Sequence, residues 1–454
     1  MRGIEGALTV LRDVEKGAFA AEALRKIWHS IEPTERKLAA TLSYATLRKL
    51  GLWRHLLSRY CKRPIESLNA ATISVLLPGI AGVMELEHFK PGVLVNALVQ
   101  RVKNIKDADG NARESALVNA VLHTVMREAP AYVESLRKST ALRDQALAAG
   151  VPGWVAAEWN ADFGMMVAKR LVQLSDTPTF LSLRLSPNVD RAKWIEAYNE
   201  SQKHKDALPS DEKEPSCEGI FSRSVRLHSN PYPIDLPGYD TGEIAPASES
   251  SIWAIETFLP YLQGNCILDM CMGRGGKAGQ LLSSLHDLKL EGWDLSQARL
   301  NATQREFKRL GVGDRAIVAH GDARALVPQT PPSAILLDAP CSGSGTWRRH
   351  PEGKWRMTPT KLRHTANLQE ELFSRAADLL TPGGVMMYCT CSIFRAENEK
   401  VVGAVLSHRA DLAEIPVRTA GAFPIQKGRP YGAFVYPENP WIDGFYVAIF
   451  RKKG

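Results

Sequence analysis

The segment ILLDAPCSGSG (residues 335–345) decides the fold that the sequence predicts. Residues 334–337 read as a buried strand, which ends in Asp338 and is followed by a Pro-Cys step and a turn of small residues. In an open α/β sheet, ligands bind just outside the carboxyl ends of the strands. The carboxylate of Asp338 and the thiol of Cys341 are therefore placed for chemistry. A strand end with a buried structural cysteine explains the stretch equally well.

Strands and helices alternate on both sides of this segment from about residue 250 onward. Further strand-like apolar runs lie at 266–270, 290–293, 316–319, 385–388 and 445–450. Helical patterns separate most of these runs, and this alternation is typical of a doubly wound sheet with helices on both faces. We therefore expect a Rossmann-like α/β domain over residues 246–454.

The front of the chain has a different pattern and a different charge. Residues 1–145 carry apolar residues at helical spacing in six or seven segments, which predicts an all-α bundle. Residues 1–150 hold 22 Lys and Arg against 15 Asp and Glu, so this third carries +7 of the net charge of +8. A basic front domain suggests a polyanionic partner such as nucleic acid, the alternative being a solvated basic surface without a partner.

A third, mixed region lies between these two. It reads as an amphipathic helix over 152–174, an alternating strand over 179–186, a short helix over 194–201 and a polar loop. We predict a small α+β module over residues 150–245, which makes three domains in all. That number suits a chain of 454 residues.

Composition excludes several classes of protein. The chain is 44% apolar and 23% charged, it has no apolar run of 18 residues, and its N-terminus lacks the features of a signal peptide. Its seven cysteines are odd in number, and no Cys-x-x-Cys or matching His pair is present. We therefore expect a cytoplasmic protein, a monomer, with no disulfide framework, no metal site and no membrane span.

A glycine-rich turn follows the first predicted strand of the α/β domain. The turn consists of Cys271, Met272, Gly273, Arg274, Gly275, Gly276 and Lys277. Asp294 ends the second strand, where an acid accepts hydrogen bonds from ribose hydroxyls, and Asp322 follows the third. The loop and the acids together indicate a nucleoside cofactor, but they do not distinguish a nicotinamide cofactor from S-adenosylmethionine. Each acid alone is equally well a helix cap or a turn residue.

A second thiol, Cys391, lies in the stretch YCTCSI (residues 388–393), again between a strand and a helix. Cys341 and Cys391 are thus both predicted at carboxyl ends of strands in one sheet. Only a few per cent of an ordinary cysteine is thiolate at neutral pH, and a nearby cation or helix N-terminus raises that fraction. Candidate cations are Arg348, Arg349, Arg395 and Lys277.

Together these motifs resemble the RNA cytosine-5 methyltransferases of the NOL1/NOP2/Sun type. The matching stretches are DAPCSGSG (338–345), RRHP (348–351), KW (354–355), TCSI (390–393), ENE (397–399) and DGF (443–445). The front domain resembles the NusB-like RNA-binding domain through RKLAATLSYATLR (36–48) and ALVNAVL (116–122). The whole chain is similar to the bacterial RsmB (Sun/Fmu) group, which acts on small-subunit ribosomal RNA.

The resemblance implies a reaction and a role for each site residue. Cys391 would add to carbon 6 of a cytosine, carbon 5 would take a methyl group from S-adenosyl-L-methionine, and Cys341 would assist release. Asp338 would hydrogen-bond the base near N3 and also line the cofactor site. The residues of the glycine-rich turn, Asp294 and Asp322 would bind the cofactor. The implied partner is RNA, 16S ribosomal RNA in particular, whose target base must leave any stack.

Two stretches depart from the family pattern. Met272, Gly273 and Arg274 replace the usual Ala-Ala-Pro of the cofactor loop, which puts the contacts of Met272 and Arg274 in doubt. Residues 244–251 (IAPASESS) stand where the family usually has Gln-Asp before its small residues. An RNA-binding or ribosome-assembly factor that keeps the fold without catalysis is the alternative function. The intact acid, both thiols and the Gly-Gly-Lys step argue against it.

Overall fold

The computed structural model describes residues 2–87, 89–104, 111–203, 215–417, 423–426 and 429–454. The chain forms two compact units. One consists of Met1–Thr177 and Trp347–Met357, and the other of Pro178–Thr346 and Thr358–Gly454. Among the described helices, none is both long enough and apolar enough to span a bilayer.

The first unit is a bundle of helices, as the sequence predicts. Its helices up to residue 148 are α1 (Arg2–Glu15), α2 (Ala20–Ile27), α3 (Pro33–Arg48), α4 (Leu50–Tyr60), α5 (Ala70–Glu85), α6 (Pro91–Lys103), α7 (Asn111–Lys138) and α8 (Leu142–Ala148). The apolar sides of these helices meet in a continuous core that includes Leu42, Trp53, Ile80, Leu98 and Leu122. This core stabilises the helices, because most of the stability of a helix in a protein comes from packing its apolar face.

Two further helices belong to this unit, where the sequence predicts a single helix over 152–174. They are α9 (Gly153–Phe163) and α10 (Met165–Leu174). Gly164 between them has a φ of +83°, a left-handed conformation that ends the first helix and costs glycine little. The prediction of one continuous helix is therefore wrong. The boundaries of the three-domain division stay a prediction.

Residues 347–357 belong to the bundle although both flanking segments belong to the other unit. Helix α15 (Glu352–Arg356) is held there by side chains that reach backbone groups of α1 to α3. Trp355 Nε1 donates to the Leu47 carbonyl at 2.5 Å, and a carboxylate oxygen of Glu352 accepts from the backbone N–H of Ala20 at 3.0 Å. Arg356 donates to the carbonyl of Val14 at 2.7 Å.

The second unit contains a mixed sheet in the strand order β11-β12-β13-β9-β8-β5-β6-β7, with β10 paired to β13. The strands are β5 (Cys266–Asp269), β6 (Lys289–Asp294), β7 (Ala316–His320), β8 (Ala334–Asp338), β9 (Val385–Thr390), β10 (Leu412–Ile415), β11 (Ile425–Gln426), β12 (Ala433–Val435) and β13 (Phe445–Lys452). Strands β5 to β9 run parallel, and β13 is antiparallel to β9. The Rossmann-like expectation is confirmed.

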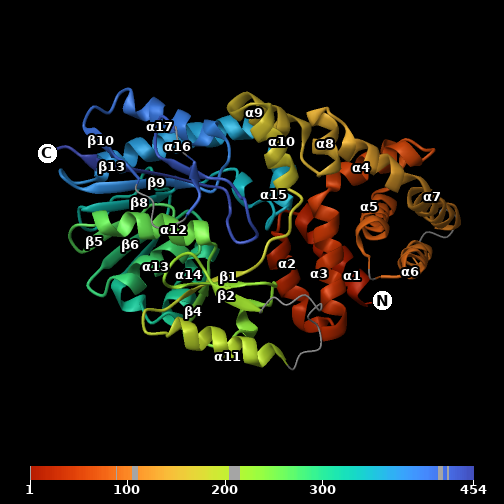
Figure 1. Ribbon diagram of the computed structural model, residues 1–454, viewed down its shortest axis with the longest axis horizontal. Helices are drawn as coiled ribbons and strands as arrows, with labels where there is room; N and C mark the ends of the chain where they lie inside the picture. The colour runs from red at the N-terminus through yellow and green to blue at the C-terminus, as the bar shows by residue number, and fades with distance from the viewer. Residues whose placement is uncertain (1, 88, 105–110, 204–214, 418–422, 427–428) are drawn as a thin grey trace. The chain divides into compact units, whose positions relative to one another are not determined.

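Helices cover both faces of this sheet. Figure 1 shows α16 (Pro359–Leu379) and α17 (Glu399–Leu406) on one face. On the other face lie α12 (Glu249–Phe258), α13 (Gly276–Ser284) and α14 (Gln297–Arg309). The strand order reverses between β5 and β8, because the chain leaves β5 toward β6 and β7 and then returns to the other side of β5. Such a reversal opens a crevice at the carboxyl edge of the sheet.

A smaller antiparallel sheet precedes α12, in the order β2-β3-β1-β4. Its strands are β1 (Ser182–Leu185), β2 (Ser216–Glu218), β3 (Ser224–Leu227) and β4 (Ile244–Pro246), with α11 (Arg191–Lys203) beside them. Leu183, Leu185 and Val225 pack with Trp194 and Tyr198 of α11 in a small apolar core. This sheet and helix form the predicted α+β module.

One buried charge in the first unit predicts a pH effect. Lys354 is 3% exposed, and burial lowers its pKa to about 7, with Asp176 acting to raise it. Asp176 gives Lys354 little help, because it forms an ion pair with Lys49 at 2.9 Å. In the unfolded chain a lysine titrates near ~10.4, so the folded state binds fewer protons between these two values. Stability should therefore rise as the pH increases through that window.

We predict that Lys354→Met raises the melting temperature more at about pH 6 than at about pH 9, since the buried ammonium costs most below the folded pKa. Differential scanning fluorimetry across this range measures the effect. Lys37→Met on the exposed face of α3 is the matched control and should give no such trend. An equal gain for Lys354→Met at both pH values would contradict the prediction.

Candidate functional site

The site lies at the carboxyl ends of β5, β6, β8 and β9, next to the strand-order reversal. Asp269, Asp294 and Asp338 end β5, β6 and β8, and Cys391 follows β9. All these ends meet at one edge because the strands are parallel. The structure thus gathers residues that are up to about 120 positions apart in the sequence.

The two predicted thiols are neighbours. The Sγ atoms of Cys341 and Cys391 lie 3.4 Å apart, and both cysteines are free and partly buried. The pKa of Cys341 is raised well above its usual value by the hydrogen bond with Cys391 and by burial. Cys341 is therefore held as a neutral thiol that can donate to the sulfur of Cys391.

Asp338 faces a cation that the sequence assigns to the cofactor loop. Lys277 Nζ lies 2.5 Å from one carboxylate oxygen of Asp338. Burial disfavours the ammonium of Lys277, but the charge of Asp338, the nearby cysteines and the hydrogen bond with Asp338 together outweigh this effect and raise the pKa of Lys277. Lys277 also lies over the ring of Phe445, 5.1 Å from its centroid. Lys277 is thus a fixed positive charge at the reacting edge of the sheet.

A third thiol, Cys389, contacts the other oxygen of Asp338. Its Sγ lies 3.5 Å from Oδ1 of Asp338, and burial raises its pKa well above the usual value. No role is predicted for this residue from the sequence. The signal was present, because alternate residues of a strand point to the same face, and Cys389 precedes Cys391 by two positions at the end of β9.

The cofactor loop is shaped by glycine. Gly273 and Gly275 have φ values of +61° and +74°. A side chain at Gly275 would meet Thr303 and Phe307, whereas Gly273 and Gly276 face open space. The backbone N–H of Gly273 donates to Asp294 at 2.9 Å, which fixes the loop against the end of β6. A ligand can therefore approach this backbone closely.

The departure in the loop has a packing explanation. Met272 is buried and fills the space over Gly292 of β6, where an added Cβ would lie 2.2 Å from its sulfur. Its backbone N–H also bonds to the carbonyl of Trp293 at 2.8 Å. Arg274, in contrast, is exposed. The side chain of Met272 thus packs in the core of the domain.

Acids surround the loop. Asp269 is fully buried, its Oδ1 has no hydrogen-bond partner among the described residues, and burial raises its pKa to about 8. Burial and the charge of Asp269 also raise the pKa of Cys271, which disfavours a thiolate there. Asp322 is more exposed, and Arg324 lowers its pKa through a bidentate contact. The carboxylate of Asp322 is therefore already bound to Arg324, whereas Oδ1 of Asp269 can still accept a hydrogen bond.

These features fit S-adenosylmethionine. The ligand carries ribose hydroxyls, an ammonium group and a sulfonium, and the loop offers carboxylates and closely approachable backbone. Asp294 suits the hydroxyls, and the free acceptor of Asp269 suits a cationic group.

Comparison with known proteins identifies the family. The family described as "16S rRNA methyltransferase RsmB/F" matches residues 256–451, and the NusB family matches residues 5–127. The α/β domain of this chain is an RsmB/F-type methyltransferase domain. The resemblance inferred from the motifs is confirmed, and so are the NusB-like front domain and S-adenosylmethionine as the cofactor.

Two relatives align with most of this chain and over most of their own length. The chain is 26% identical over 93% of its length to "Ribosomal RNA small subunit methyltransferase B" of Xanthomonas campestris pv. campestris, covering 90% of that protein. It is 28% identical to the protein of that name from Thermus thermophilus, covering 98% of this chain and 96% of that one.

Two solved structures share the fold. PH0851 superposes with a TM-score of 0.78 at 19% identity, over 99% of this chain and 98% of that one. NSun6 from Pyrococcus horikoshii, with SFG, superposes with a TM-score of 0.56 at 18% identity, over 67% of this chain and 98% of that one.

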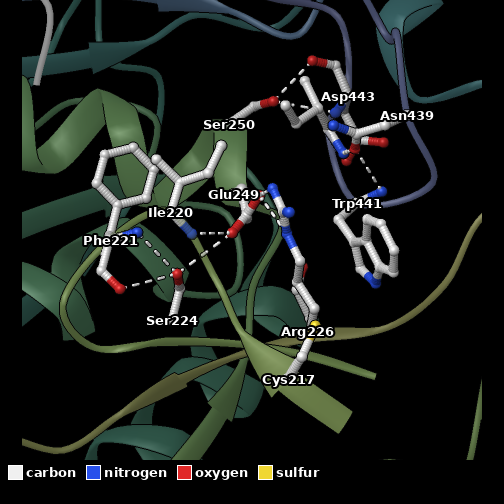
Figure 2. Close-up of polar contacts among 12 residues, drawn as sticks. Cys217, Ile220, Phe221, Ser224, Arg226, Glu249, Ser250, Asn439, Trp441 and Asp443 are labelled. Atoms are coloured by element: carbon white, nitrogen blue, oxygen red, sulfur yellow. Dashed lines mark hydrogen bonds and ion pairs between the residues drawn. The ribbon is translucent and has the colours of Figure 1, made fainter. Parts of the chain in front are cut away.

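The second departure from the RsmB/F pattern, in residues 244–251, forms a buried polar cluster (Figure 2). Glu249, in the first turn of α12, is fully buried and accepts from the backbone N–H of Ile220 at 2.7 Å and from Ser224 Oγ at 3.2 Å. Arg226 of β3 completes the cluster through an ion pair with Glu249, and it lies over the ring of Trp441. Glu249 thus ties the small sheet to α12.

Hydrogen bonds connect this cluster to the turn that follows Cys341. Ser250 Oγ donates to the carbonyl of Asp443 at 2.7 Å, and the N–H of Gly444 donates to the Gly345 carbonyl at 3.0 Å. A side chain at Gly345 would lie 2.0 Å from the carbonyl oxygen of Gly444, so only glycine fits. Gly345 in turn donates to the Cys391 carbonyl at 2.9 Å. The DGF stretch therefore supports the turn that follows Cys341.

The predicted cations divide between the two units. Lys277 and Arg395 belong to the unit that holds the thiols, and Arg395 contacts Glu399 at 3.8 Å. Arg348 and Arg349 belong to the helical unit, where Arg348 donates to Thr177 Oγ1 at 2.9 Å. Within the thiol-containing unit, Lys277 is the predicted cation that contacts Asp338.

We predict that Asp294→Ala weakens S-adenosylmethionine binding by at least about tenfold, because hydrogen bonds to a buried carboxylate contribute ~1.5–3 kcal/mol each. Isothermal titration calorimetry on the full chain measures the change. Asp287→Ala, which removes an exposed acid of the same domain, is the control and should leave the affinity unchanged. Wild-type affinity in Asp294→Ala would show that the acid does not hold the ligand.

Proposed function

We propose that this chain methylates carbon 5 of a cytosine in small-subunit ribosomal RNA through a covalent cysteine adduct. The observation that carries the proposal is the pair of thiols at 3.4 Å beside the Lys277–Asp338 ion pair. The names of the relatives from Xanthomonas campestris and Thermus thermophilus support ribosomal RNA as the substrate. The excess of Lys and Arg in residues 1–150 supports a polyanionic partner.

The reaction needs a nucleophile because carbon 5 of cytosine is itself a poor one. The Sγ of Cys391 adds to carbon 6 and forms an S–C6 bond, and the electron pair of the C5=C6 double bond becomes available at carbon 5. S-adenosylmethionine, when bound, supplies the methyl group that carbon 5 takes up. Asp338, held by Lys277, hydrogen-bonds the N3 edge of the ring and stabilises the adduct.

Release reverses the addition. The proton on carbon 5 passes to water, its bonding pair re-forms the C5=C6 double bond, and Cys391 leaves as a thiolate. Cys341 assists by donating a hydrogen bond to the departing sulfur. This role suits a thiol that lies 3.4 Å from Cys391 and whose pKa is raised. The two cysteines therefore have different tasks although they are similar in exposure.

A small-molecule substrate is disfavoured by the NusB-family domain over residues 5–127, which a small-molecule methyltransferase does not need. A role as an RNA-binding factor without catalysis is disfavoured by the intact set of Asp338, Cys341, Cys391 and Lys277 at one strand edge.

We predict opposite phenotypes for the two cysteines. Cys391→Ala should abolish methyl transfer and form no adduct. Cys341→Ala should accumulate a covalent protein–RNA complex, because the adduct forms but is not released. Denaturing gels with labelled ribosomal RNA and S-adenosylmethionine show the complex as a slow band, and mass spectrometry locates the attached residue.

Cys61→Ala in the helical unit, far from both thiols in the sequence, is the control and should behave as the wild type. Full activity in Cys391→Ala would contradict the assignment of Cys391 as the nucleophile. Normal turnover in Cys341→Ala without any adduct would show that Cys341 does not assist release of the product.

A further inference from the structure

Glu397 is a buried carboxylate that the proposed reaction does not use. It ends the 3-10 turn Arg395–Glu397 and is fully buried. One oxygen accepts from the backbone N–H of Ser342 at 2.7 Å. The other accepts from the Oγ atoms of Ser342, at 2.5 Å, and Ser392. One carboxylate thus binds two serines that are 50 residues apart in the sequence.

These serines are the direct neighbours of the two thiols. Ser342 follows Cys341, and Ser392 follows Cys391. We propose that Glu397 is a positioning residue that holds both cysteine turns on one anchor and so fixes the separation of the two sulfur atoms. The consequence for turnover rests on the proposed function, whereas the positioning itself does not.

The hydroxyls of these serines also lie close to each other and to a third hydroxyl, that of Ser344. Ser342 Oγ and Ser392 Oγ lie 3.2 Å apart, and Ser344 Oγ lies 3.2 Å from each of them. Ser344 Oγ in turn accepts from the N–H of Ile393 at 2.7 Å. The two turns are thus joined by a buried hydroxyl network, and Glu397 is its acceptor. A buried hydrogen-bond network that joins two turns favours a single, rigid arrangement of them.

Glu397 is itself held by two other elements. Gln369 of α16 donates to it at 3.3 Å and also to the Pro340 carbonyl at 2.8 Å. Tyr388 Oη of β9 donates to the backbone carbonyl of Glu397 at 2.6 Å. Helix α16 therefore contacts the carboxylate of Glu397, and strand β9 holds its backbone.

The charge of Glu397 acts on one thiol in particular. The hydrogen bond with Cys391, burial and the nearby charges of Cys391 and Glu397 together raise the pKa of Cys341. A neutral Cys341 is the form that can donate to the departing sulfur of Cys391. Glu397 thus favours both the distance and the protonation state that release requires.

Three variants separate positioning from charge. Glu397→Gln keeps an acceptor for the N–H of Ser342, and its amide group can donate to the serine hydroxyls, which are able to accept. Glu397→Ala removes the anchor from both turns. Ser392→Ala releases only the turn of Cys391 and keeps the carboxylate and its bonds to Ser342.

The test measures the thiol separation directly, on the full chain without RNA or S-adenosylmethionine. Diamide oxidises two neighbouring thiols to a disulfide and is itself reduced to the hydrazine, so the rate of Cys341–Cys391 disulfide formation reports how often the sulfurs meet. We expect a rate about tenfold lower in Glu397→Ala and Ser392→Ala, and within about threefold of wild type in Glu397→Gln. Peptide mapping by mass spectrometry quantifies the disulfide.

Glu352→Ala is the matched control, because Glu352 is buried like Glu397 but lies in the helical unit, where it accepts from the backbone N–H of Ala20 rather than from the cysteine turns. It should lower the melting temperature and leave the rate unchanged. Circular dichroism identifies the variants that fold. If Glu397→Ala does not fold, the disulfide rate of Ser392→Ala tests the proposal in its place. Wild-type disulfide rates in the folded Glu397 and Ser392 variants would overturn the proposal.

Turnover gives an independent readout. In Glu397→Ala and Ser392→Ala the kcat for methyl transfer should fall with the affinity for S-adenosylmethionine unchanged, and Glu397→Gln should recover most of it. A lower disulfide rate in a chain that methylates no cytosine would refute the proposed function and leave the positioning role intact.

Discussion

The site depends on one ion pair, that of Lys277 with Asp338. Parallel strands bring Asp269, Asp294 and Asp338 to the same edge, where burial, and after it the charge of Asp338, raises the pKa of Asp269. Lys277 enters this group from the first turn of α13, so the helix that follows the cofactor loop also supplies the balancing charge. Lys277 of the cofactor loop and Asp338 are therefore electrostatically coupled, so that a change in the charge of one alters the other.

A second constraint concerns the loops that follow β8 and β9. Each loop is short, and each has a serine after its cysteine. Their separation is set by contacts with Glu397 and by the backbone bond from Gly345 to Cys391. The small residues of the SGSG turn therefore serve two purposes: they leave space beside the thiols, and at Gly345 they admit the close approach of Gly444. Residues remote in sequence meet here because β8 and β9 are neighbouring parallel strands.

Much of this architecture follows from the sequence. Apolar runs before Asp294 and Asp338, separated by helical patterns, predict parallel strands, and parallel strands place their ends together. That rule alone brings Cys341 and Cys391 to one edge. It gives no distances, however, so the partner of Lys277 and the contact of Cys389 with Asp338 emerge only in the structure. These contacts depend on side-chain directions, which strand assignment does not fix.

Other features lie beyond pattern reading for a different reason. Glu397 sits in a polar stretch typical of a surface turn, and only tertiary packing buries it. Likewise, residues 347–357 follow the catalytic turn directly, yet Trp355 and Arg356 bond to the helical bundle. Periodicity describes local structure and cannot assign a short segment to a distant unit. The break at Gly164 shows the same limit, because one glycine conformation divides an otherwise continuous amphipathic pattern.

The most direct test of the central claim is the chemical identity of the methylated nucleoside. The full chain is incubated with unmodified small-subunit ribosomal RNA and S-adenosylmethionine carrying a labelled methyl group, and the digested nucleosides are separated by liquid chromatography and mass spectrometry. The account predicts that the label appears in 5-methylcytidine. Label in N4-methylcytidine, in a 2′-O-methylated nucleoside or in a purine would contradict this proposal, because none of those products requires a thiol to add to carbon 6 of a cytosine.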